Sequence, residues 1–597
     1  MFCFVPPCKR SYTSVRCLVR HLRSKHKAFY EENFATKHRH PDVLDESGHE
    51  QEQNSRNETE LSRDLKVIIA KQLLKIREFH HLTSAAVVAV NDIIHNVGVH
   101  IKDNLLFNVT DYLKRAEFDN WQELHSIISE DNDFEDACSS LNSQKKLETF
   151  AELNLNVVNP VQQYLVSNNS SRGSYQYIPI LQTLKYLLQF EDIFSEVVNG
   201  HISQDNTLQD VCDGELFKEN ILFSESHKHL QLMLYFDDFN VVNPLGNKLK
   251  KHKLSAFYMT LGNISPKFRS QNKSIFLVAL CRSKLVKEYG HAKILEPLLD
   301  DVKILETEGL SIEKDGQHLV FKGSILVTCC DNLAAHSLGG FSESFISQKP
   351  CRFCNVTLES LRKGEIGVLR TKEAYNSQCN LVRQCPDLGK AYGLKKSSPL
   401  NQLSCFHVIH GLPSDISHDI LEGVAKTLLG QVIEHCIQSG YFSIEYINSI
   451  IDHFPWKADD KTNKPGHIYC TGRSVDIKQT ATQCLCLLRT LPLLIGENIP
   501  FHDSKWSLYL HFRDVVDFLF MPAIKPGQVY FLDDLIESFI NDYKRLCPES
   551  QLTAKCHYMK HYPHEIRLFG PLRNVSILRF EAKHQELFVN LLPNAVR

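Results

Sequence analysis

The chain has 597 residues, which is too long for one ordinary domain and corresponds to about three to five domains of average size. Its formal net charge of −3 excludes a protein that coats nucleic acid along its whole surface, so any such binding must come from local patches. The sequence has no run of about 18 uninterrupted apolar residues and no secretory signal at its start. We therefore expect an intracellular protein with no membrane span, whose 19 cysteines are reduced and serve metal binding more readily than disulfides.

The first 30 residues match a single C2H2 zinc finger with the spacing C-x4-C-x12-H-x4-H. Two cysteines at a β-turn and two histidines one helical turn apart supply the four ligands that tetrahedral zinc requires. Met1, Tyr12 and Leu18 stand where the small ββα fold needs its apolar core, and zinc supplies the rest of the folding energy. The predicted ligands are Cys3, Cys8, His21 and His26.

The helix of this finger is a candidate nucleic-acid contact. Three of its positions face the bases of about 3 base pairs in this fold, and here they are Ser14, Cys17 and Arg20. Arg20 suits a guanine edge. The residues that suit phosphates are Arg16, Arg23 and Lys25. The alternatives are a finger that binds RNA or protein, or one that only supports its neighbour, and a single finger is too short to select a DNA site alone.

Two segments follow the finger. Residues 31–60 are polar and acidic, which predicts a linker. From residue 61 to about 118 the apolar residues recur at helical spacing, and further helical segments follow. Residues 61–222 are therefore predicted to form a helical domain, to which we assign no chemistry.

The pattern changes to buried strands within residues 223–345. Apolar runs predict strands at 230–236, 253–264 and 273–281, then a helix over 284–307. A hairpin with Asp315 and Gly316 in its turn precedes a last strand at 323–330. Three strands, a helix and another strand is the order of a ribonuclease-H-like α/β core. The predicted fold class is thus multidomain α+β.

Acidic residues follow two of these strands, Asp237 with Asp238 and then Asp331. Carboxylates in such places can share two Mg²⁺ ions, which activate a water or a 3′-hydroxyl and stabilise the leaving oxygen of a phosphodiester. The alternative is that these acids only form turns, as acids at strand ends commonly do.

Four segments, in this order, resemble sequence blocks of eukaryotic cut-and-paste transposases of the CACTA/Chapaev type. FDDFNVVNPLGNKLKKHKLSAFYMTLGN resembles the block with the first acid, and DNLAAHSLGGFSESFISQKPCRFC resembles the block with the second acid and a C-x2-C. GLPSDISHDILEG resembles the D-x2-H motif, here Asp415 and His418. FGPLRNVSILRFEAKH resembles the block with the final glutamate, here Glu581. Together they cover about residues 228–584.

This resemblance implies a DDE nuclease and integrase that acts on DNA in the nucleus with Mg²⁺ or Mn²⁺, and as a homo-oligomer. Asp237, Asp331 and Glu581 would be its metal-binding triad, and Asp238 is the alternative first acid. Residues 346–570 would be a large, mostly helical insertion, comparable to that of V(D)J recombinase catalytic subunits. Residues 571–597 would return to the core with the final acid.

A second metal site is predicted around Cys351 and Cys354 in KPCRFCN, a half-site that needs two further ligands. The candidate ligands are His407, His410, His418, and the pair His557 and His561. In the recombinase-like families such a C-x2-C joins a histidine pair shortly before the final glutamate. That resemblance favours zinc at Cys351, Cys354, His557 and His561. Two buried free cysteines with unrelated histidines are the alternative.

The D-x2-H segment leaves further questions open. His418 could contact the acids without binding the metal ions itself. Glu422 is an alternative to Glu581 as the active-site glutamate, because it lies three positions after Asp419 on a predicted helix. Two functions therefore remain in view: a transposase-derived, zinc-finger DNA-binding protein that retains metal-dependent DNA cleavage and strand transfer, or a non-enzymatic nuclear DNA-binding or regulatory protein built on the same body. An ordinary zinc-finger regulator with an unrelated interaction domain is the third possibility.

Overall fold

The computed structural model describes residues 60–584, except 80–81, 156, 167–171, 227, 241–252 and 472–473. Asp64–Arg597 make up one unit of the chain, and the account below concerns that unit. The predicted finger and linker lie outside the described residues, as does the N-P-L-G turn of the first-acid block. The finger residues concerned are Cys3, Cys8, Ser14, Arg16, Cys17, Arg20, His21, Arg23, Lys25 and His26.

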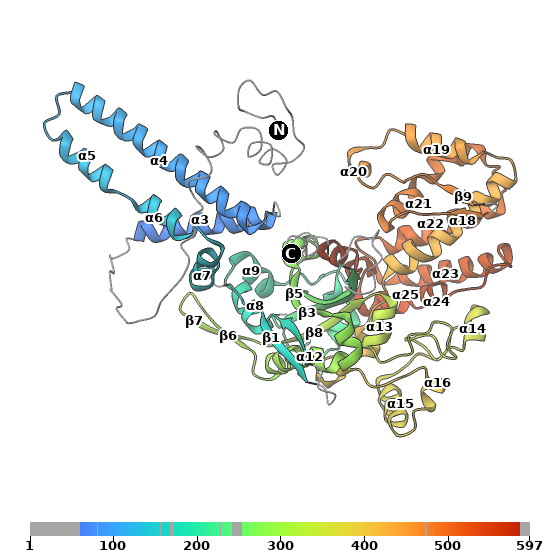
Figure 1. The fold of residues 1–597 in the computed structure, drawn as a ribbon. Helices are drawn as coiled ribbons and strands as arrows, with labels where there is room; N and C mark the ends of the chain where they lie inside the picture. The colour runs from blue at the N-terminus through green and yellow to red at the C-terminus, as the bar shows by residue number, and fades with distance from the viewer. Residues whose placement is uncertain are drawn as a thin grey trace. The chain divides into compact units, whose positions relative to one another are not determined.

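The predicted helices after residue 60 are present, and they pack around a small core of their own (Figure 1). Leu73, Val87 and Ala137 are buried at its centre. The second helix begins after Thr83, whose side chain accepts the backbone N–H of Ala86 and so caps it. The helices are α3 (Glu60–Phe79), α4 (Ser84–Arg115), α5 (Trp121–Glu130), α6 (Asp133–Ser140) and α7 (Gln144–Asn154).

Helix α4 exposes an apolar stripe. Ile93, Val97, Ile101 and Leu105 recur every four positions, which places them along one side of the helix, and each is more than half exposed. By length and composition alone α4 could cross a membrane, and 11% of its apolar window is buried. One such helix is weak evidence for a membrane span, because core helices of other proteins pass the same test.

The next part of the chain builds a mixed sheet of six strands in the order β1-β2-β5-β4-β3-β8. Neighbours are antiparallel except β3 and β8, which are parallel. The predicted strands and the hairpin at Asp315 and Gly316 are all present, because long runs of β-branched, aromatic and leucine residues suit strands covered on both faces. The strands are β1 (Val161–Val166), β2 (Arg172–Tyr177), β3 (Leu230–Asn240), β4 (Lys253–Leu261), β5 (Phe276–Arg282), β6 (Leu310–Lys314), β7 (Gln317–Phe321) and β8 (Gly323–Cys330).

The expectation of helices throughout 61–222 is wrong for residues 161–177. This segment forms the hairpin β1–β2, and β2 pairs with β5 at the edge of the sheet. Each strand is only six residues long, so its period-2 pattern is a weak signal. Tyr175 and Tyr177, which alternate with polar residues, are buried against the sheet.

The two faces of the sheet belong to different apolar cores, and the side chains of β3 alternate between these two cores. Met233 and Tyr235 belong to the core that includes the helices of 417–569, whereas Leu234 and Phe236 belong to the core that includes α12 (Ser283–Thr307). Alternation along a strand then sends Asp237 to the first face and Asp238 to the second. The sequence placed Asp237 and Asp238 at the C-terminal end of this strand, but β3 continues to Asn240, so both acids lie within it.

Residues 346–570 are mostly helical, as expected, and most of these helices pack into one apolar core with the sheet (Figure 1). A small hairpin of β9 (Tyr469–Thr471) and β10 (Ser474–Asp476) interrupts them, and residues 417–424 (Ser417–Val424) are π-helical. The helices are α14 (Leu358–Arg362), α15 (Lys372–Gln384), α16 (Leu388–Tyr392), α17 (Val408–Gly411), α18 (Ala425–Gln438), α19 (Ile444–His453), α20 (Ala458–Lys461), α21 (Ala481–Ile495), α22 (Ser504–Leu519), α23 (Pro526–Leu546), α24 (Ala554–Met559) and α25 (Tyr562–Phe569).

The shorter helices around the sheet complete the described fold. They are α8 (Ile180–Leu187), α9 (Glu191–Asn199), α10 (Glu215–Lys218), α11 (Pro266–Arg269) and α13 (Asn332–Leu338).

Asp210 forms a buried ion pair with Arg269, which also donates a hydrogen bond to the carbonyl of Gly262 just after β4. Arg269, 5% exposed, donates to both carboxylate oxygens of Asp210, at 2.7 and 2.5 Å, and His201 contacts Asp210 at 2.7 Å. Burial raises the pKa of Asp210, but the charge and hydrogen bonds of Arg269 and the contact with His201 outweigh this and lower it to about 2.

Asp210→Asn is therefore expected to reduce the free energy of unfolding by roughly 3–5 kcal/mol at neutral pH, because it leaves Arg269 buried without its partner. Since the folded pKa lies below the ordinary 3.8, the wild-type advantage is present above that value and is lost as pH falls towards about 2. Urea unfolding at neutral pH and in acid measures both. The exposed Asp300→Asn is the control, and an equal small loss in both variants would contradict the prediction.

Candidate metal centre and acidic site

The structure brings Cys351, Cys354, His557 and His561 together, although the two pairs lie more than 200 residues apart. Each side chain is at most 3% exposed. Cys351 Sγ lies 3.5 Å from His561 Nε2, and Cys354 Sγ lies 3.3 Å from His557 Nε2. The two Nε2 atoms are 3.2 Å apart, and all four ligand atoms lie within 4.8 Å of one another.

These distances fit a tetrahedral ion. With Zn–S near 2.3 Å and Zn–N near 2.0–2.1 Å, a tetrahedron has S···N edges of roughly 3.6 Å and an N···N edge of roughly 3.3 Å. The observed separations of 3.5, 3.3 and 3.2 Å match those edges. The four residues are therefore a buried Cys2His2 group that could hold zinc.

Local structure on both sides holds the ligands in place. The N–H of Phe353 donates to Cys351 Sγ at 3.3 Å, so the loop turns around the sulfur. The N–H of Arg370 donates to the carbonyl of Phe353 at 2.8 Å, and its Nε donates to the carbonyl of Cys351 at 3.2 Å. His557 lies in α24 and His561 stands immediately before α25, four positions later, so both rings point the same way.

Hydrogen bonding within the group favours the thiolate that zinc binds. The hydrogen bond with Cys351, together with those of His557 and His561, lowers the pKa of Cys354 against the effect of burial. The other candidate histidines do not join this group: His407 caps α17 by accepting the N–H of Ile409, and neither His410 nor His418 is among its members.

The acids of β3 and β8 lie next to each other across the sheet. Phe236 pairs with Cys330 in the parallel register, so Asp237 and Asp331 each stand one step beyond the same rung. Adjacent strands are about 4.8 Å apart. Asp331 also begins α13, where its Oδ1 accepts the N–H of Ala334 at 2.6 Å. Asp238 faces away from them, because its Oδ1 accepts hydrogen bonds from Ser255 and Ser283.

Glu581 comes from the helical residues 578–584 and lies within the electrostatic influence of Asp237. Burial, and then the charge of Asp331, raises the pKa of Asp237 to about 6. Burial raises the pKa of Glu581 to about 7, where the charge of His418 opposes the shift and the charges of Asp237, Asp415 and Glu422 add to it. Among the described residues, these carboxylates do not form a group with all ligand atoms within 4.8 Å.

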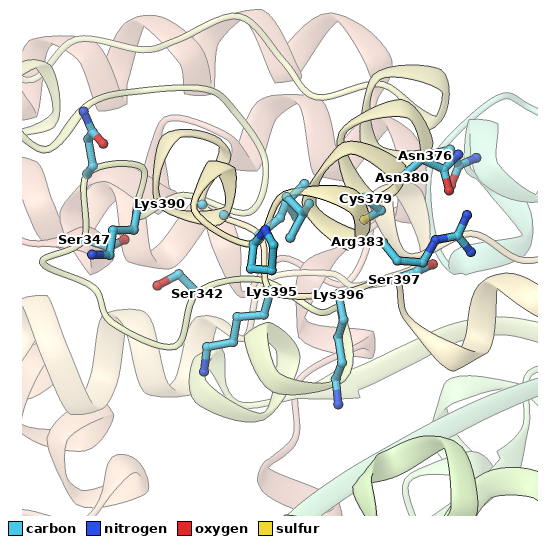
Figure 2. A pocket seen from close by; sticks show the side chains of 16 residues that line it. Ser342, Ser347, Asn376, Cys379, Asn380, Arg383, Lys390, Lys395, Lys396 and Ser397 are labelled. Atoms are coloured by element: carbon cyan, nitrogen blue, oxygen red, sulfur yellow. The ribbon is translucent and has the colours of Figure 1, made fainter.

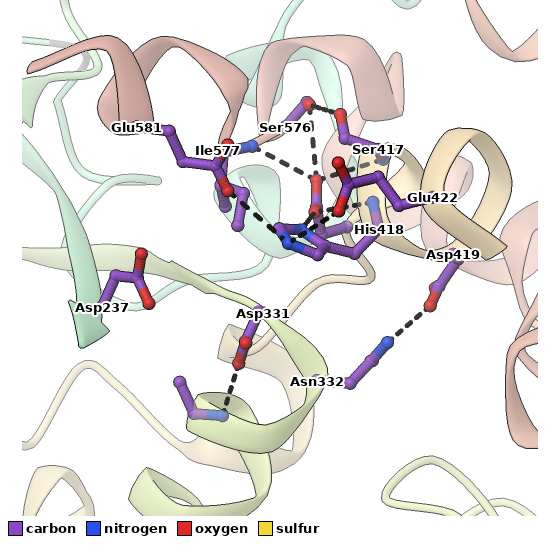
Figure 3. Close-up of polar contacts among 12 residues, drawn as sticks. Asp237, Asp331, Asn332, Ser417, His418, Asp419, Glu422, Ser576, Ile577 and Glu581 are labelled. Atoms are coloured by element: carbon purple, nitrogen blue, oxygen red, sulfur yellow. Dashed lines mark hydrogen bonds and ion pairs between the residues drawn. The ribbon is translucent and has the colours of Figure 1, made fainter. Parts of the chain in front are cut away.

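His418 stands beside Glu581, as Figure 3 shows. Its Nδ1 contacts Asp415 Oδ2 at 2.6 Å, and its Nε2 lies 3.6 Å from carboxylate oxygens of both Glu581 and Glu422. Burial lowers the pKa of His418, but the hydrogen bond and charge of Asp415, followed by the two glutamates, raise it to about 9. His418 is thus a cation between two carboxylates, and Glu422 lies on its far side from Asp237 in Figure 3.

Asp415 ties this motif to the last helix. It is 1% exposed, and its Oδ1 accepts the N–H of Ile577 at 3.2 Å and the hydroxyl of Ser576 at 3.3 Å. The D-x2-H segment therefore fixes the turn from which Glu581 extends.

Buried hydrogen bonds join the loop of the Cys2His2 group to Asp419 in the D-x2-H segment. Arg352, between the two cysteines, donates to Asn332 Oδ1 at 2.6 Å, and the Asn332 amide donates to Asp419. Tyr562, next to His561, donates to the other oxygen of Asp419 at 3.3 Å. Sequence reasoning assigned no role to Asn332 or Arg352, and only their places beside Asp331 and Cys351 could have pointed to them.

His584 is a further residue that sequence reasoning missed. Its Nδ1 lies 3.6 Å from Asp237 Oδ2, and its ring stacks on Phe239 at a centroid distance of 4.4 Å. It lies three positions after Glu581, one helical turn along, which is the signal that could have identified it.

A second group of metal-ligand type, His201, Asp210 and Cys212, also has its ligand atoms within 4.8 Å. Arg269 already neutralises Asp210 there. The geometry fits an ion pair, not a cation site.

No protein-family model matches this chain, and no curated protein matches its sequence.

Proposed function

We propose that the chain is a transposase-derived nuclease that cleaves DNA with divalent metal ions held by Asp237, Asp331 and Glu581. The observation that carries this proposal is the placement of Asp237 and Asp331 one step beyond the same rung of two parallel strands, on the face that also receives Glu581.

The electrostatics of the three acids support a cation at this place. The elevated pKa values of Asp237 and Glu581 arise partly from neighbouring negative charge, which a divalent cation would neutralise. Two ions about 4 Å apart span a wider site than one ion does, so carboxylates that serve them need not converge on one point. Mg²⁺ or Mn²⁺ bound there would activate the attacking oxygen and stabilise the leaving one.

The strand order supports a ribonuclease-H-like core. Strands β5, β4 and β3 are antiparallel neighbours, and β8 returns parallel to β3 after the helix α12. The first acid would lie on the interior strand β3 and the second at the end of the edge strand β8, with the β1–β2 hairpin as an addition at the far edge.

The Cys2His2 group has a structural role in this proposal. Zinc held by Cys351, Cys354, His557 and His561 would fix the two ends of the insertion to each other. Through Arg352, Asn332 and Asp419 it would also fix the D-x2-H segment that positions the helix of Glu581. We further propose a nuclear protein that the finger tethers to DNA and that acts as a homo-oligomer.

One observation favours the second function, a DNA-binding or regulatory protein without catalysis. His418 lies 3.6 Å from Glu581, and its pKa of about 9 keeps it charged at neutral pH. A protonated histidine already compensates the glutamate and would compete with a metal ion for it.

Metal-dependent cleavage tests the proposal directly. We expect the full-length chain to nick or cut labelled duplex DNA with Mg²⁺ or Mn²⁺, and to stop when EDTA removes the ion. Binding of the same duplex should persist in EDTA. Cleavage that survives EDTA would contradict a metal-dependent nuclease, and binding without cleavage under either ion would favour the non-enzymatic function.

A further inference from the structure

A cavity of about 1000 Å³ opens in the insertion, and its lining includes neither the Cys2His2 ligands nor the acids described above. Its walls are the loop that follows α13, the helices α15 and α16, and the loop after α16 (Figure 2). Four cations line it, and none of its lining residues is acidic or aromatic. They are Arg383, Lys390, Lys395 and Lys396.

Among the described residues, most of this positive charge has no counter-charge. Lys395 pairs with Glu343 at 2.9 Å, but Arg383, Lys390 and Lys396 make no ion pair with any described residue. Figure 2 shows Lys395 and Lys396 extending from their loop to the same side. Like charges that share a concave surface concentrate the positive potential there, and an anion would neutralise it.

The fold holds these cations around the cavity by tight backbone packing. Gly340 has φ of +72°, and a Cβ there would lie 2.0 Å from the carbonyl oxygen of Lys396. The N–H of Lys395 donates to the carbonyl of Gly340 at 2.8 Å. Arg370 Nη2 donates to the carbonyl of Tyr392 at 2.9 Å, while its Nε holds the carbonyl of Cys351. The cavity wall is therefore tied to the Cys2His2 loop.

The lining selects one kind of anion. Serine, asparagine and glutamine side chains complete the polar wall, and with the lysines and Arg383 they supply hydrogen-bond donors for phosphate oxygens. Without an aromatic ring the cavity has no stacking platform for the bases of a single strand. The side chain of Ser347 adds a hydroxyl oxygen with no hydrogen-bond partner among the described residues.

We propose that this cavity binds the phosphate backbone of a DNA duplex beside the place where the strand is cut. The assignment rests on the proposed function for its choice of DNA, and on the lining itself for its choice of phosphate. Asp331 caps α13, whose seven residues are about 10 Å long, and Ser342 of the cavity wall follows four residues after that helix ends. The cavity is then a flanking contact that positions the duplex and takes no part in bond cleavage.

The test compares two triple variants of the full-length chain that lose equal charge. The cavity variant carries Arg383→Ala, Lys390→Ala and Lys396→Ala, and the control carries Lys457→Ala, Lys461→Ala and Lys478→Ala, which are exposed residues elsewhere in the insertion. Fluorescence anisotropy with a labelled duplex measures Kd across a range of salt concentrations. The cavity variant should bind at least about 10-fold more weakly, and its salt slope should fall by about 0.9 for each phosphate that it no longer neutralises. The control should match the wild type.

Repeating the measurement with Cys3→Ser and Cys8→Ser removes any contribution of the predicted finger, and the difference between the variants should persist. Equal affinities and slopes for cavity and control variants would overturn the proposal. Calorimetry with ATP and with inorganic phosphate forms the other arm. ATP binding that the cavity variant loses while duplex affinity is unchanged would assign the cavity to a free nucleotide and also overturn it.

The proposal for the cavity and the proposal of nuclease activity can be contradicted independently. If the full chain never cleaves DNA but its duplex binding depends on the cavity cations, the proposed catalysis is wrong and the cavity assignment stands. If it cleaves with Mg²⁺ while both triple variants bind equally well, the nuclease stands and the cavity assignment is wrong.

Discussion

A chain carrying Asp237→Asn is expected to cleave duplex DNA about 1000-fold more slowly than the wild type, which corresponds to about 4 kcal/mol of activation free energy. The side chain of Asp237 lies beside Asp331 and within the influence of Glu581, so its charge is needed to hold the metal ions. Single-turnover cleavage with Mg²⁺ measures the loss. Duplex affinity in EDTA should be unchanged, because the substitution keeps the size of the side chain.

The next residue is a matched control. Asp238→Asn makes the same change one position along, but Asp238 faces the opposite side of β3, where Ser255 and Ser283 hydrogen-bond to it. It should keep its cleavage activity. The reverse result, with Asp238→Asn inactive and Asp237→Asn active, would show that Asp238 is the first acid. Asp237→Cys that regains activity with Mn²⁺ but not with Mg²⁺ would identify direct ligation, because a thiolate suits the softer ion.

Cys354→Ser is expected to remove one zinc ion from each chain and to reduce the free energy of unfolding by more than about 4 kcal/mol, an exceptional loss for one substitution. Structural zinc contributes about 10–16 kcal/mol in finger peptides, and this group is buried and has four ligands. Metal analysis of the purified chain should find two zinc ions in the wild type, one of them in the finger, and one in the variant. Urea unfolding measures the stability.

Cys484→Ser controls for the chemistry of the substitution. Cys484 is fully buried in α21 and belongs to no metal-ligand group among the described residues, so it should cost only about 1–3 kcal/mol and leave both ions bound. A wild-type chain that binds a single zinc ion, or equal losses in the two variants, would show that the Cys2His2 group is not a zinc site.

The sequence predicted the long strands of the sheet well, because they are continuous apolar runs. An amphipathic helix of similar length would show polar residues at helical spacing. It was weakest where elements are short. The β1–β2 hairpin has six-residue strands, and its place is decided by pairing with β5, about 100 residues later. Pairing over such a separation leaves no local signal in the strands themselves.

The candidate sites divide in the same way. The spacing of Cys351 and Cys354 and of His557 and His561 was visible, but choosing those histidines over His407 and His410 needed a resemblance. Asp238 remained an alternative to Asp237, because both acids were predicted at the very end of the strand. Once β3 runs to Asn240, alternation separates the two residues onto opposite faces. The link from Arg352 through Asn332 to Asp419 spans distant segments, and no local pattern predicts it.

The Cys2His2 group also bears on how this chain can change in evolution. Cys354 and His557 are 203 positions apart in sequence, yet their ligand atoms are in contact. The long segment between them therefore begins and ends at the Cys2His2 group. We expect a short element such as α20 to tolerate a change of length without displacing the helix that carries Glu581, whereas α19 and β10 contribute buried residues to the shared core. Because its ends are joined, the segment between them can change and acquire new surfaces while the acids keep their arrangement.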